Sequence, residues 1–227
     1  MSWHREHLPK PLPREPLSTV LRWQAEAASK RTQPYPNSMA LATVDGRGHP
    51  SVRIVLCKEI VARPGYITFY TNYDSRKGHD LAAVPRAAVV MHWDHLHRQV
   101  RIEGPITRTS AADSDGYFAS RHWHSRVGAW ASAQSQPVNS RATLMASFSN
   151  TAKRLGLPAL GDERQDDPGV PIPRPPHWGG YHLWAEQVEL WVEGDARLHD
   201  RAQWARTLTP EGDGFQCGPW TVSRLQP

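Results

Sequence analysis

The chain has 227 residues, of which 39% are hydrophobic and 22% are charged, and its formal net charge at pH 7 is +5. A chain of this length can bury a large core without staples, and its two cysteines, Cys57 and Cys217, form no disulfide framework. It contains no run of the roughly 18 apolar residues that a membrane helix needs, and no secretory signal, so a cytoplasmic protein is expected. The modest charge, without a run of five basic residues, does not indicate a nucleic-acid binder.

The first half of the chain has mainly strand-like patterns. Residues 1–14 are polar and rich in proline, which predicts an irregular arm. Apolar residues at helical spacing after Pro16 predict a helix that ends near Arg31. Runs of apolar and β-branched residues, separated by turn signals, then predict a series of strands. These strands cover residues 39–44, 52–56, 66–71, 87–93 and 99–107.

Helical periodicity and a proline-rich segment separate these strands from the last ones. Helices are predicted over residues 75–84, 110–121 and 140–155, with Ser110 as the cap of the second. Residues 156–177 contain six prolines and three glycines, which predicts a surface loop. Strands over 181–193, 197–206 and 220–225 complete the pattern. Together the elements predict one β-rich α+β domain over residues 15–227, with its sheet closed into a barrel.

Several common site motifs are missing from the sequence. The glycines after the first predicted strand do not form a dinucleotide fingerprint, because Ser51 stands where the third glycine belongs. Walker A, G-x-S-x-G and HExxH sequences are also absent. In the histidine-rich stretch, strand alternation would place His95 and His97 on one face and His92 on the other. We interpret that stretch as a polar strand end and predict no metal site.

Basic residues at the start of the helix over 75–84 indicate a phosphate site. Ser75, Arg76 and Lys77 directly follow a strand and open that helix. A helix N-terminus presents free N–H groups and the positive end of the helix dipole, and the two basic side chains add charge. Taken alone, however, the same pattern is also typical of a capped, solvated helix start.

Two further groups of residues point to anion binding. Tyr117, Arg121 and Ser125 follow one another at helical i, i+4 spacing, and their hydroxyl and guanidinium groups can hold a phosphate. In the predicted strand 197–206, Arg197, His199 and Arg201 would share one face. Cations in such a row repel one another unless an anion lies among them.

Seven ordered segments carry a resemblance that no single motif provides. They are RIVLCK at 53–58, FYTNYDSRKG at 69–78, RQVRIEG at 98–104, YFASR at 117–121, SRVGAWASAQS at 125–135, WGGYHL at 178–183 and ELWVEGDARLHDR at 189–201. Together they resemble the pyridoxamine 5′-phosphate oxidase family, over most of residues 37–227. The resemblance implies an FMN-binding split β-barrel and a homodimer with FMN at the subunit interface.

The resemblance also implies a role for individual residues. Flavin-binding positions are Arg53, Lys58, Tyr70, Thr71, Arg76, Lys77, Gln99, Gln134, Ser135, Trp191 and Arg201. Substrate-phosphate positions are Lys58, Tyr117, Arg121 and Ser125, and the pair beside the reacting carbon is Arg197 and His199. Strand alternation places Arg53 and Lys58 on opposite faces, so a bulge, strong twist or contact beyond the strand end is needed for both to reach ligands.

The implied reaction is the oxidation of pyridoxine or pyridoxamine 5′-phosphate to pyridoxal 5′-phosphate, with molecular oxygen reduced to hydrogen peroxide. One alternative is a related flavin oxidase of secondary metabolism, of the phenazine type. Another is a flavin- or haem-binding split-barrel protein without catalytic activity. Lys58, Tyr117 and Arg121 favour a phosphorylated substrate over the first alternative, and the Arg197-x-His199 pair argues against the second.

Overall fold

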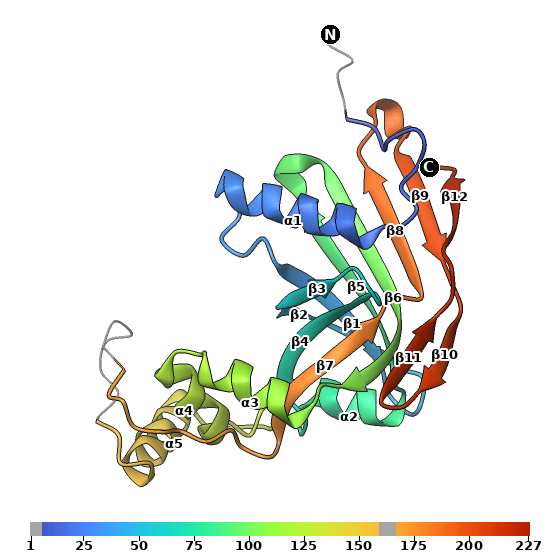
Figure 1. Cartoon of the computed structure of the whole chain (residues 1–227). Helices are drawn as coiled ribbons and strands as arrows, with labels where there is room; N and C mark the ends of the chain where they lie inside the picture. Colours follow the sequence, from blue (N-terminus) through green and yellow to red (C-terminus); the bar gives the residue numbers. More distant parts are fainter. Residues whose placement is uncertain (1–5, 159–166) are drawn as a thin grey trace.

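A strongly curled antiparallel sheet forms the centre of the molecule (Figure 1). This computed structural model describes residues 6–158 and 167–227. The sheet's main path runs β12–β9–β8–β6–β5–β1–β2, and a branch continues from β6 through β7 and β4 to β3. The strands of the main path are β1 (Ser38–Val44), β2 (Pro50–Leu56), β5 (Arg86–Trp93), β6 (Arg98–Arg108), β8 (Gln187–Val192), β9 (Asp200–Ala205) and β12 (Thr221–Leu225). The branch consists of β3 (Glu59–Val61), β4 (Tyr66–Asn72) and β7 (Trp178–Trp184).

The long strand β6 connects the two parts of the sheet. Its first half pairs with β8 and its last residues pair with β7, so the sheet divides near Gly104. A Cβ atom on Gly104 would lie 1.9 Å from the carbonyl oxygen of Trp184, which explains why glycine is needed where the backbones approach. The predicted strand 181–193 is therefore wrong as one element, because it is divided into β7 and β8. Sequence patterning also missed β3 and the hairpin of β10 (Leu208–Glu211) and β11 (Gly214–Cys217).

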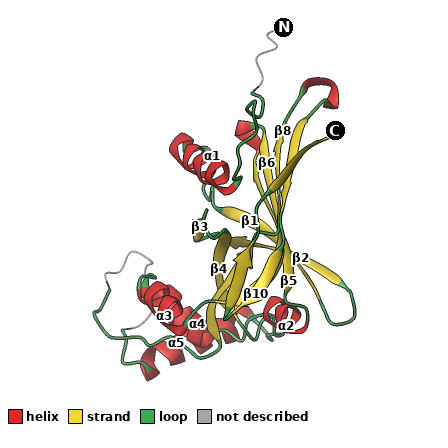
Figure 2. Ribbon diagram, turned by 45° about the vertical axis from the view of Figure 1, so that its right-hand side comes forward, coloured by secondary structure: helices red, strands yellow, loops and turns green. Residues whose placement is uncertain are grey.

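Helices cover the sheet at two places (Figure 2). Helix α1 (Leu17–Lys30) packs against the sheet through buried residues that include Leu17, Val20 and Trp23. Helix α2 (Arg76–Ala83) lies beside β1, and α3 (Ala111–Ala119), α4 (Trp123–Ala131) and α5 (Arg141–Arg154) form a separate group. The four predicted helices are confirmed within about two residues at each end, a normal uncertainty for helix boundaries. Helix α4 was not predicted.

Two hydrophobic clusters stabilise these layers. The larger lies between the sheet and α1 and includes Leu41, Trp93 and Trp204, none of them exposed to solvent. The smaller lies among the helices α3, α4 and α5 and is centred on the fully buried Trp123 and on Phe118. The second cluster gives the α3–α5 group its own packing, which fixes the position of this group beside β4 and β7.

The N-terminal arm follows the far end of the sheet. Within residues 6–14 the chain has no helix or strand, and its Leu8 is buried. The Leu8 N–H donates to Asp200 at 2.9 Å, and the Trp204 indole N–H donates to the carbonyl of Pro13 at 2.8 Å. Residues 167–177 are also irregular, whereas the central part of the predicted loop 156–177, residues 159–166, lies outside the described residues. No helix of the described segments is long and apolar enough to cross a membrane.

Candidate functional site

A cavity of about 580 Å³ lies where β2, β4 and α2 meet the α3–α4 segment. Four of its lining side chains are lysine or arginine, and no carboxylate lines it among the described residues. Such a charge distribution favours an anionic ligand. The cavity brings together nine of the residues that the sequence indicated: Arg53, Lys58, Tyr70, Thr71, Lys77, Tyr117, Arg121, Ser125 and Gln134.

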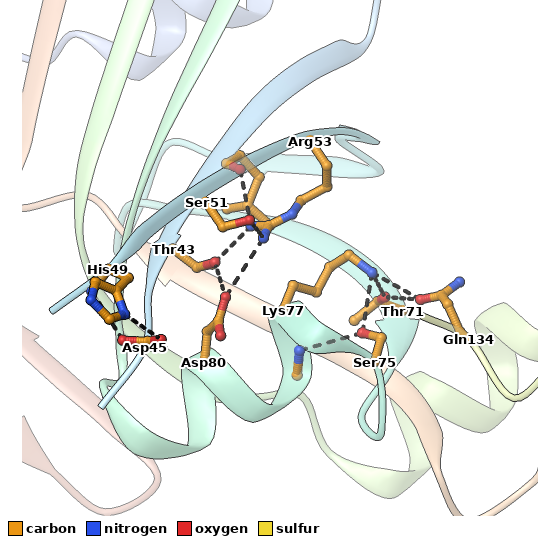
Figure 3. A network of polar contacts seen from close by, with 12 residues as sticks. Thr43, Asp45, His49, Ser51, Arg53, Thr71, Ser75, Lys77, Asp80 and Gln134 are labelled. Atoms are coloured by element: carbon orange, nitrogen blue, oxygen red, sulfur yellow. Dashed lines mark hydrogen bonds and ion pairs between the residues drawn. The ribbon is translucent and has the colours of Figure 1, made fainter. Parts of the chain in front are cut away.

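The start of α2 places a buried ammonium group at this cavity (Figure 3). Ser75 caps the helix, since its Oγ accepts from the backbone N–H of Gly78 at 3.3 Å. The Lys77 Nζ donates to Thr71 Oγ1 and Ser75 Oγ, each at 3.1 Å, and to Gln134 Oε1 at 2.8 Å. Burial, together with the nearby charge of Arg53, lowers the pKa of Lys77 to about 8, and the carboxylate of Asp80 partly opposes this shift. All three acceptors are neutral, so among the residues that the structure describes the ammonium has no directly bonded counter-ion.

Arg53 reaches the same region from β2. Its guanidinium donates to Thr43 Oγ1 at 2.7 Å and to Ser51 Oγ at 2.9 Å, and lies 3.6 Å from the buried carboxylate of Asp80 (Figure 3). Burial lowers the pKa of Arg53, while Asp80 opposes this effect. Lys58 lies two residues beyond the end of β2, so strand alternation does not apply to it, and both cations line the cavity.

The residues predicted to hold the substrate phosphate do not lie on one helix. They lie around the break between two helices. Tyr117 belongs to α3 and Ser125 to α4, and Arg121 lies between these helices. The i, i+4 interpretation is therefore wrong in its geometry, although the three residues do meet at the cavity. The Arg121 guanidinium lies 4.8 Å from the centroid of a Trp178 ring, and its Nη1 is buried without a hydrogen-bond partner in the described parts of the chain. A buried donor without a partner is rare in proteins, and an anion in the cavity would satisfy it.

Aromatic rings form one wall of the cavity. Tyr70 and Tyr117 stack with their centroids 4.0 Å apart, and Trp178 stacks on Tyr70 at 5.5 Å. The Lys58 ammonium lies 5.6 Å from the centroid of Tyr117. Trp178 was not predicted as a site residue, although it opens the WGGYHL segment. In the sequence alone, Trp178 cannot be distinguished from a tryptophan that only packs in the core.

Three other predicted residues lie side by side in the main sheet, away from the cavity. Gln99 of β6 is in register with Trp191 of β8, which is in register with Arg201 of β9. The Arg201 Nε donates to Glu189 Oε1 at 2.9 Å, and its Nη1 donates to the carbonyl of Gln226 at 2.9 Å. The hydrogen bond to the buried Glu189 raises the pKa of Arg201. Glu189 was missed by the sequence analysis, although its position two residues before Trp191 places both on one face.

The predicted row of Arg197, His199 and Arg201 on one strand face is wrong. Strand β9 begins only at Asp200, and Arg197 ends the 3₁₀ turn η2 (Asp195–Arg197). The backbone of Arg197 is left-handed, with φ 63°. His199 turns back to Trp191, and the centroids of the two rings are 4.6 Å apart. The loop therefore places the His199 ring against Trp191 of the Gln99, Trp191 and Arg201 group.

Strand order and register keep these two groups apart within one chain. Strands β1, β5 and β6 separate β2 from β8 in the sheet. Arg53 is in register with Leu41, a core residue, whereas Trp191 precedes Val192 and follows Leu190, both of which point into the core. The groups consequently occupy opposite faces of the sheet. One chain by itself does not surround a single ligand with both groups.

The remaining predicted residues lie close to the cavity. Arg76 is exposed at the first position of α2, where its charge lowers the pKa of Arg53. Ser135 is exposed next to Gln134 and has a left-handed backbone, with φ 72°.

The histidine-rich stretch spans the end of β5 and the turn η1 (Asp94–Leu96), where His97 contacts the Glu193 carboxylate. Within the described parts of the chain, no cluster of three or more potential ligands could hold a metal ion.

Two segments of the chain match known families. Residues 25–152 match the family described as pyridoxamine 5′-phosphate oxidase. Residues 178–227 match the family described as the pyridoxine 5′-phosphate oxidase C-terminal dimerisation region. A pyridoxine/pyridoxamine 5′-phosphate oxidase of Burkholderia cenocepacia is 48% identical over 213 residues, which cover 94% of this chain and 89% of the relative. One from Paraburkholderia xenovorans is 46% identical, covering 94% and 90%.

Solved structures share the fold. PhzG from Burkholderia lata, in complex with tetrahydrophenazine-1-carboxylic acid, superposes with a TM-score of 0.77 at 27% identity, covering 95% of this chain and 94% of PhzG. A pyridoxamine 5′-phosphate oxidase-related, FMN binding protein from Nostoc punctiforme gives a TM-score of 0.66 at 16% identity, covering 93% and 97%. These structures have the split-barrel fold that the sequence resemblance implied, and that prediction is confirmed.

Proposed function

The chain belongs to the pyridoxamine 5′-phosphate oxidase family, and on that premise we propose that it produces pyridoxal 5′-phosphate with FMN as cofactor. Pyridoxine 5′-phosphate and O₂ would give pyridoxal 5′-phosphate and H₂O₂. Pyridoxamine 5′-phosphate would consume one water in addition and release ammonia. In either case the bond that breaks is the C–H bond at the 4′ carbon.

The observation that carries the proposal is the basic cavity, which no carboxylate of residues 6–158 and 167–227 lines. Two phosphorylated ligands require two cationic positions, and the cavity offers both. Arg53, Lys77 and the neighbouring Arg76 would hold the flavin phosphate, with Tyr70, Thr71, Gln134 and Ser135 beside them. Lys58, Tyr117, Arg121 and Ser125 would hold the substrate phosphate. The unpartnered Nη1 of Arg121 is the group that such a phosphate would satisfy.

Bound FMN would supply the redox chemistry of the reaction, namely hydride acceptance and reoxidation by oxygen. The side chains of this chain orient the substrate. Arg197 would hold the substrate ring over the flavin, and His199 would contact the heteroatom on the 4′ carbon. Gln99, Trp191 and Arg201 would contact the flavin, with Arg201 held in place by Glu189.

We further propose that the complete site forms between two protomers of a homodimer. The segment matched as a dimerisation region, residues 178–227, contains Trp191, Arg197, His199 and Arg201. Trp191 and Arg201 lie on the sheet face opposite to Arg53, and the His199 ring packs against Trp191, so a second copy would have to supply them to the cavity. Val52 and Ile54 of the edge strand β2 are each 67% exposed, and a partner protomer would bury them.

The direct test is to purify the protein, record its visible spectrum and add pyridoxine 5′-phosphate in air. We expect a flavin spectrum and equimolar formation of aldehyde and hydrogen peroxide. Unphosphorylated pyridoxine serves as a control that should react poorly. If bound flavin is present but neither product forms, the proposed activity is wrong. In anaerobic mixing, Arg197→Ala should slow the bleaching of the flavin by substrate, whereas near-normal bleaching would reject its orienting role.

A second candidate activity is oxidation of a phenazine precursor, which the structural likeness to PhzG favours. The two activities differ in the anionic group of the substrate, a phosphate or a ring carboxylate. The ratio of kcat/KM for pyridoxine 5′-phosphate and for a tetrahydrophenazine carboxylate discriminates between them. We expect the phosphorylated substrate to be preferred, because Lys58, Tyr117 and Arg121 converge on one cavity.

A further inference from the structure

The loop that carries Arg197 and His199 is folded tightly back on itself. Ala196 and Arg197 both have left-handed backbones, with φ 52° and 63°. Residues other than glycine adopt this conformation only when the surroundings enforce it. The Leu198 N–H donates to the carbonyl of Asp195 at 2.9 Å, and at the base of the loop a Cβ atom on Gly194 would be 2.0 Å from the carbonyl oxygen of Leu198. The glycine thus allows both ends of the loop to touch.

At the base of the loop the main chain contacts the imidazole ring of His199. The backbone N–H of Gly194 donates to the Nδ1 atom of His199 at 3.2 Å. A backbone N–H is only a donor, so Nδ1 must offer its lone pair and cannot itself carry a proton. In the neutral ring the proton is then on Nε2. The Trp191 ring packs against the imidazole at 4.6 Å between centroids, which restrains the orientation of the ring.

We infer that the Gly194 N–H is a positioning group that holds neutral His199 with its proton on Nε2, so that His199 acts as a hydrogen-bond donor to the substrate. The inference rests on the proposed function for the identity of the substrate. The atom that receives this hydrogen bond would be the heteroatom on the 4′ carbon, which needs a free lone pair. An alcohol oxygen has one, and an amine has one only when it is unprotonated.

This arrangement is the reverse of a catalytic triad. In a triad a carboxylate accepts from Nδ1–H, and Nε2 is left free to take a proton. Here the partner of Nδ1 is a donor. The adjacent carboxylate, Asp200, accepts instead from the N–H of Leu8 at 2.9 Å and from the guanidinium of Arg224. The geometry therefore excludes Nε2 of neutral His199 as the acceptor of the substrate hydroxyl proton.

The tautomer can be measured without any turnover. Protein labelled with ¹⁵N in glycine and histidine, with FMN added, is examined by NMR at a pH where the ring is neutral, and His199→Gln identifies the His199 signals. We expect an unprotonated Nδ1, a protonated Nε2, and a coupling through the hydrogen bond from the Gly194 nitrogen to Nδ1. A protonated Nδ1, or the absence of this coupling, overturns the inference whether or not the protein oxidises vitamin B6 compounds.

Two substitutions of the ring test the donor role in the reaction. The amide nitrogen of glutamine reaches about as far as Nε2, whereas that of asparagine reaches only about as far as Nδ1. His199→Gln should therefore retain a kcat about tenfold above that of His199→Asn, the value of one hydrogen bond of ~1.4 kcal/mol. Equal losses in both variants would contradict the donor role. Gly194 itself is not substituted, because any side chain would displace Leu198.

Discussion

Lys77 carries a charge inside the protein with only neutral oxygen atoms bonded to its amine. Its side chain is mostly buried, and burial lowers its pKa from 10.5 to about 8. Because the folded chain binds its proton less tightly than the unfolded chain, this lysine destabilises the ligand-free fold at neutral pH. Part of that cost is recovered as pH rises from about 8 toward 10.5. A phosphate ligand would instead stabilise the charged form.

From this follows a pH dependence of FMN binding. Below pH 8 Lys77 is charged before FMN arrives, and above pH 8 binding must also take up a proton. We expect the affinity for FMN to fall as pH rises above about 8, by up to about tenfold per pH unit. Fluorescence titration of the flavin between pH 7 and 10 measures this dependence. Lys77→Arg is the matched control, since a guanidinium stays charged, and its affinity should change less over the same range. A flat profile in the unmodified protein would contradict the role assigned to Lys77.

Arg121 provides a second prediction at this scale. Its Nη1 is a buried donor without a hydrogen-bond partner in the described parts of the chain. A charge-assisted hydrogen bond from it to the substrate phosphate would contribute about 1.5–3 kcal/mol of binding free energy. Arg121→Met should therefore raise the KM for pyridoxine 5′-phosphate on the order of 10- to 100-fold. FMN content should remain unchanged, because this residue is assigned to the substrate phosphate.

Arg108 supplies the control for that substitution. It is exposed and lies 4.2 Å from the Tyr73 ring centroid, so it resembles Arg121 in stacking on an aromatic ring but does not line the cavity. Steady-state kinetics of Arg108→Met should match those of the unmodified protein. A KM that rises equally in both variants would assign the effect to general charge and not to the cavity.

At the scale of elements, sequence patterns predict those strands and helices whose formation depends on neighbouring residues in the chain. Strand β1 and its partner β2 alternate clearly, and Ser75 and Ser110 mark helix starts with their capping hydroxyls. Helix α4 was missed because tertiary packing stabilises it. A Cβ atom on its Gly128 would lie 2.8 Å from the Phe148 ring of α5, so the glycine that weakens the helix pattern is also what lets the two helices approach.

Tertiary contacts that the local sequence does not show also explain the wrong predictions in the last third of the chain. Residues 181–193 contain no glycine, proline or other turn signal, so nothing local reveals that β7 and β8 pair with different halves of β6. The period-two spacing of Arg197 and His199 is typical of a strand, and it led to the wrong prediction of a strand that includes them. The tight loop depends on a turn hydrogen bond from the Leu198 N–H to the Asp195 carbonyl and on the absence of a side chain at Gly194, where a Cβ atom would meet the Leu198 carbonyl.

The two serine caps allow a prediction for α2. Ser75→Ala and Ser110→Ala each remove a hydroxyl that accepts from a backbone N–H, at 3.3 Å and 3.0 Å, which costs about 1 kcal/mol of unfolding free energy. Ser75 also accepts from the Lys77 ammonium, so its removal should cost more and should weaken FMN binding. Urea unfolding and flavin titration measure the two effects. Equal unfolding costs and unchanged FMN affinity would show that Ser75 serves the helix alone.

At the scale of the whole molecule, the sequence resemblance predicts the site residues but not how far apart one chain places them. Their positions depend on which strand and which sheet face each side chain occupies, and strand order cannot be read from the sequence alone. In the fold, the cavity group lies beside β2 and the group of Trp191, His199 and Arg201 lies across β8 and β9, on the opposite face. Two-fold association of identical chains would unite them, since each protomer then gives and receives the same set.

Mixed dimers test this arrangement. One chain carries Lys58→Met and Arg121→Met, and the other carries Arg197→Ala and His199→Ala, with different tags so that heterodimers are isolated. Each variant homodimer should be nearly inactive. If the site is shared, the heterodimer contains one intact site and one site with both defects, and its activity should be about half that of the unmodified dimer. The reciprocal heterodimer, in which one chain carries all four substitutions and the other none, should then be inactive, because each of its sites has one defective half. A site contained in one chain predicts the opposite pair of results, so the two heterodimers together decide between the arrangements.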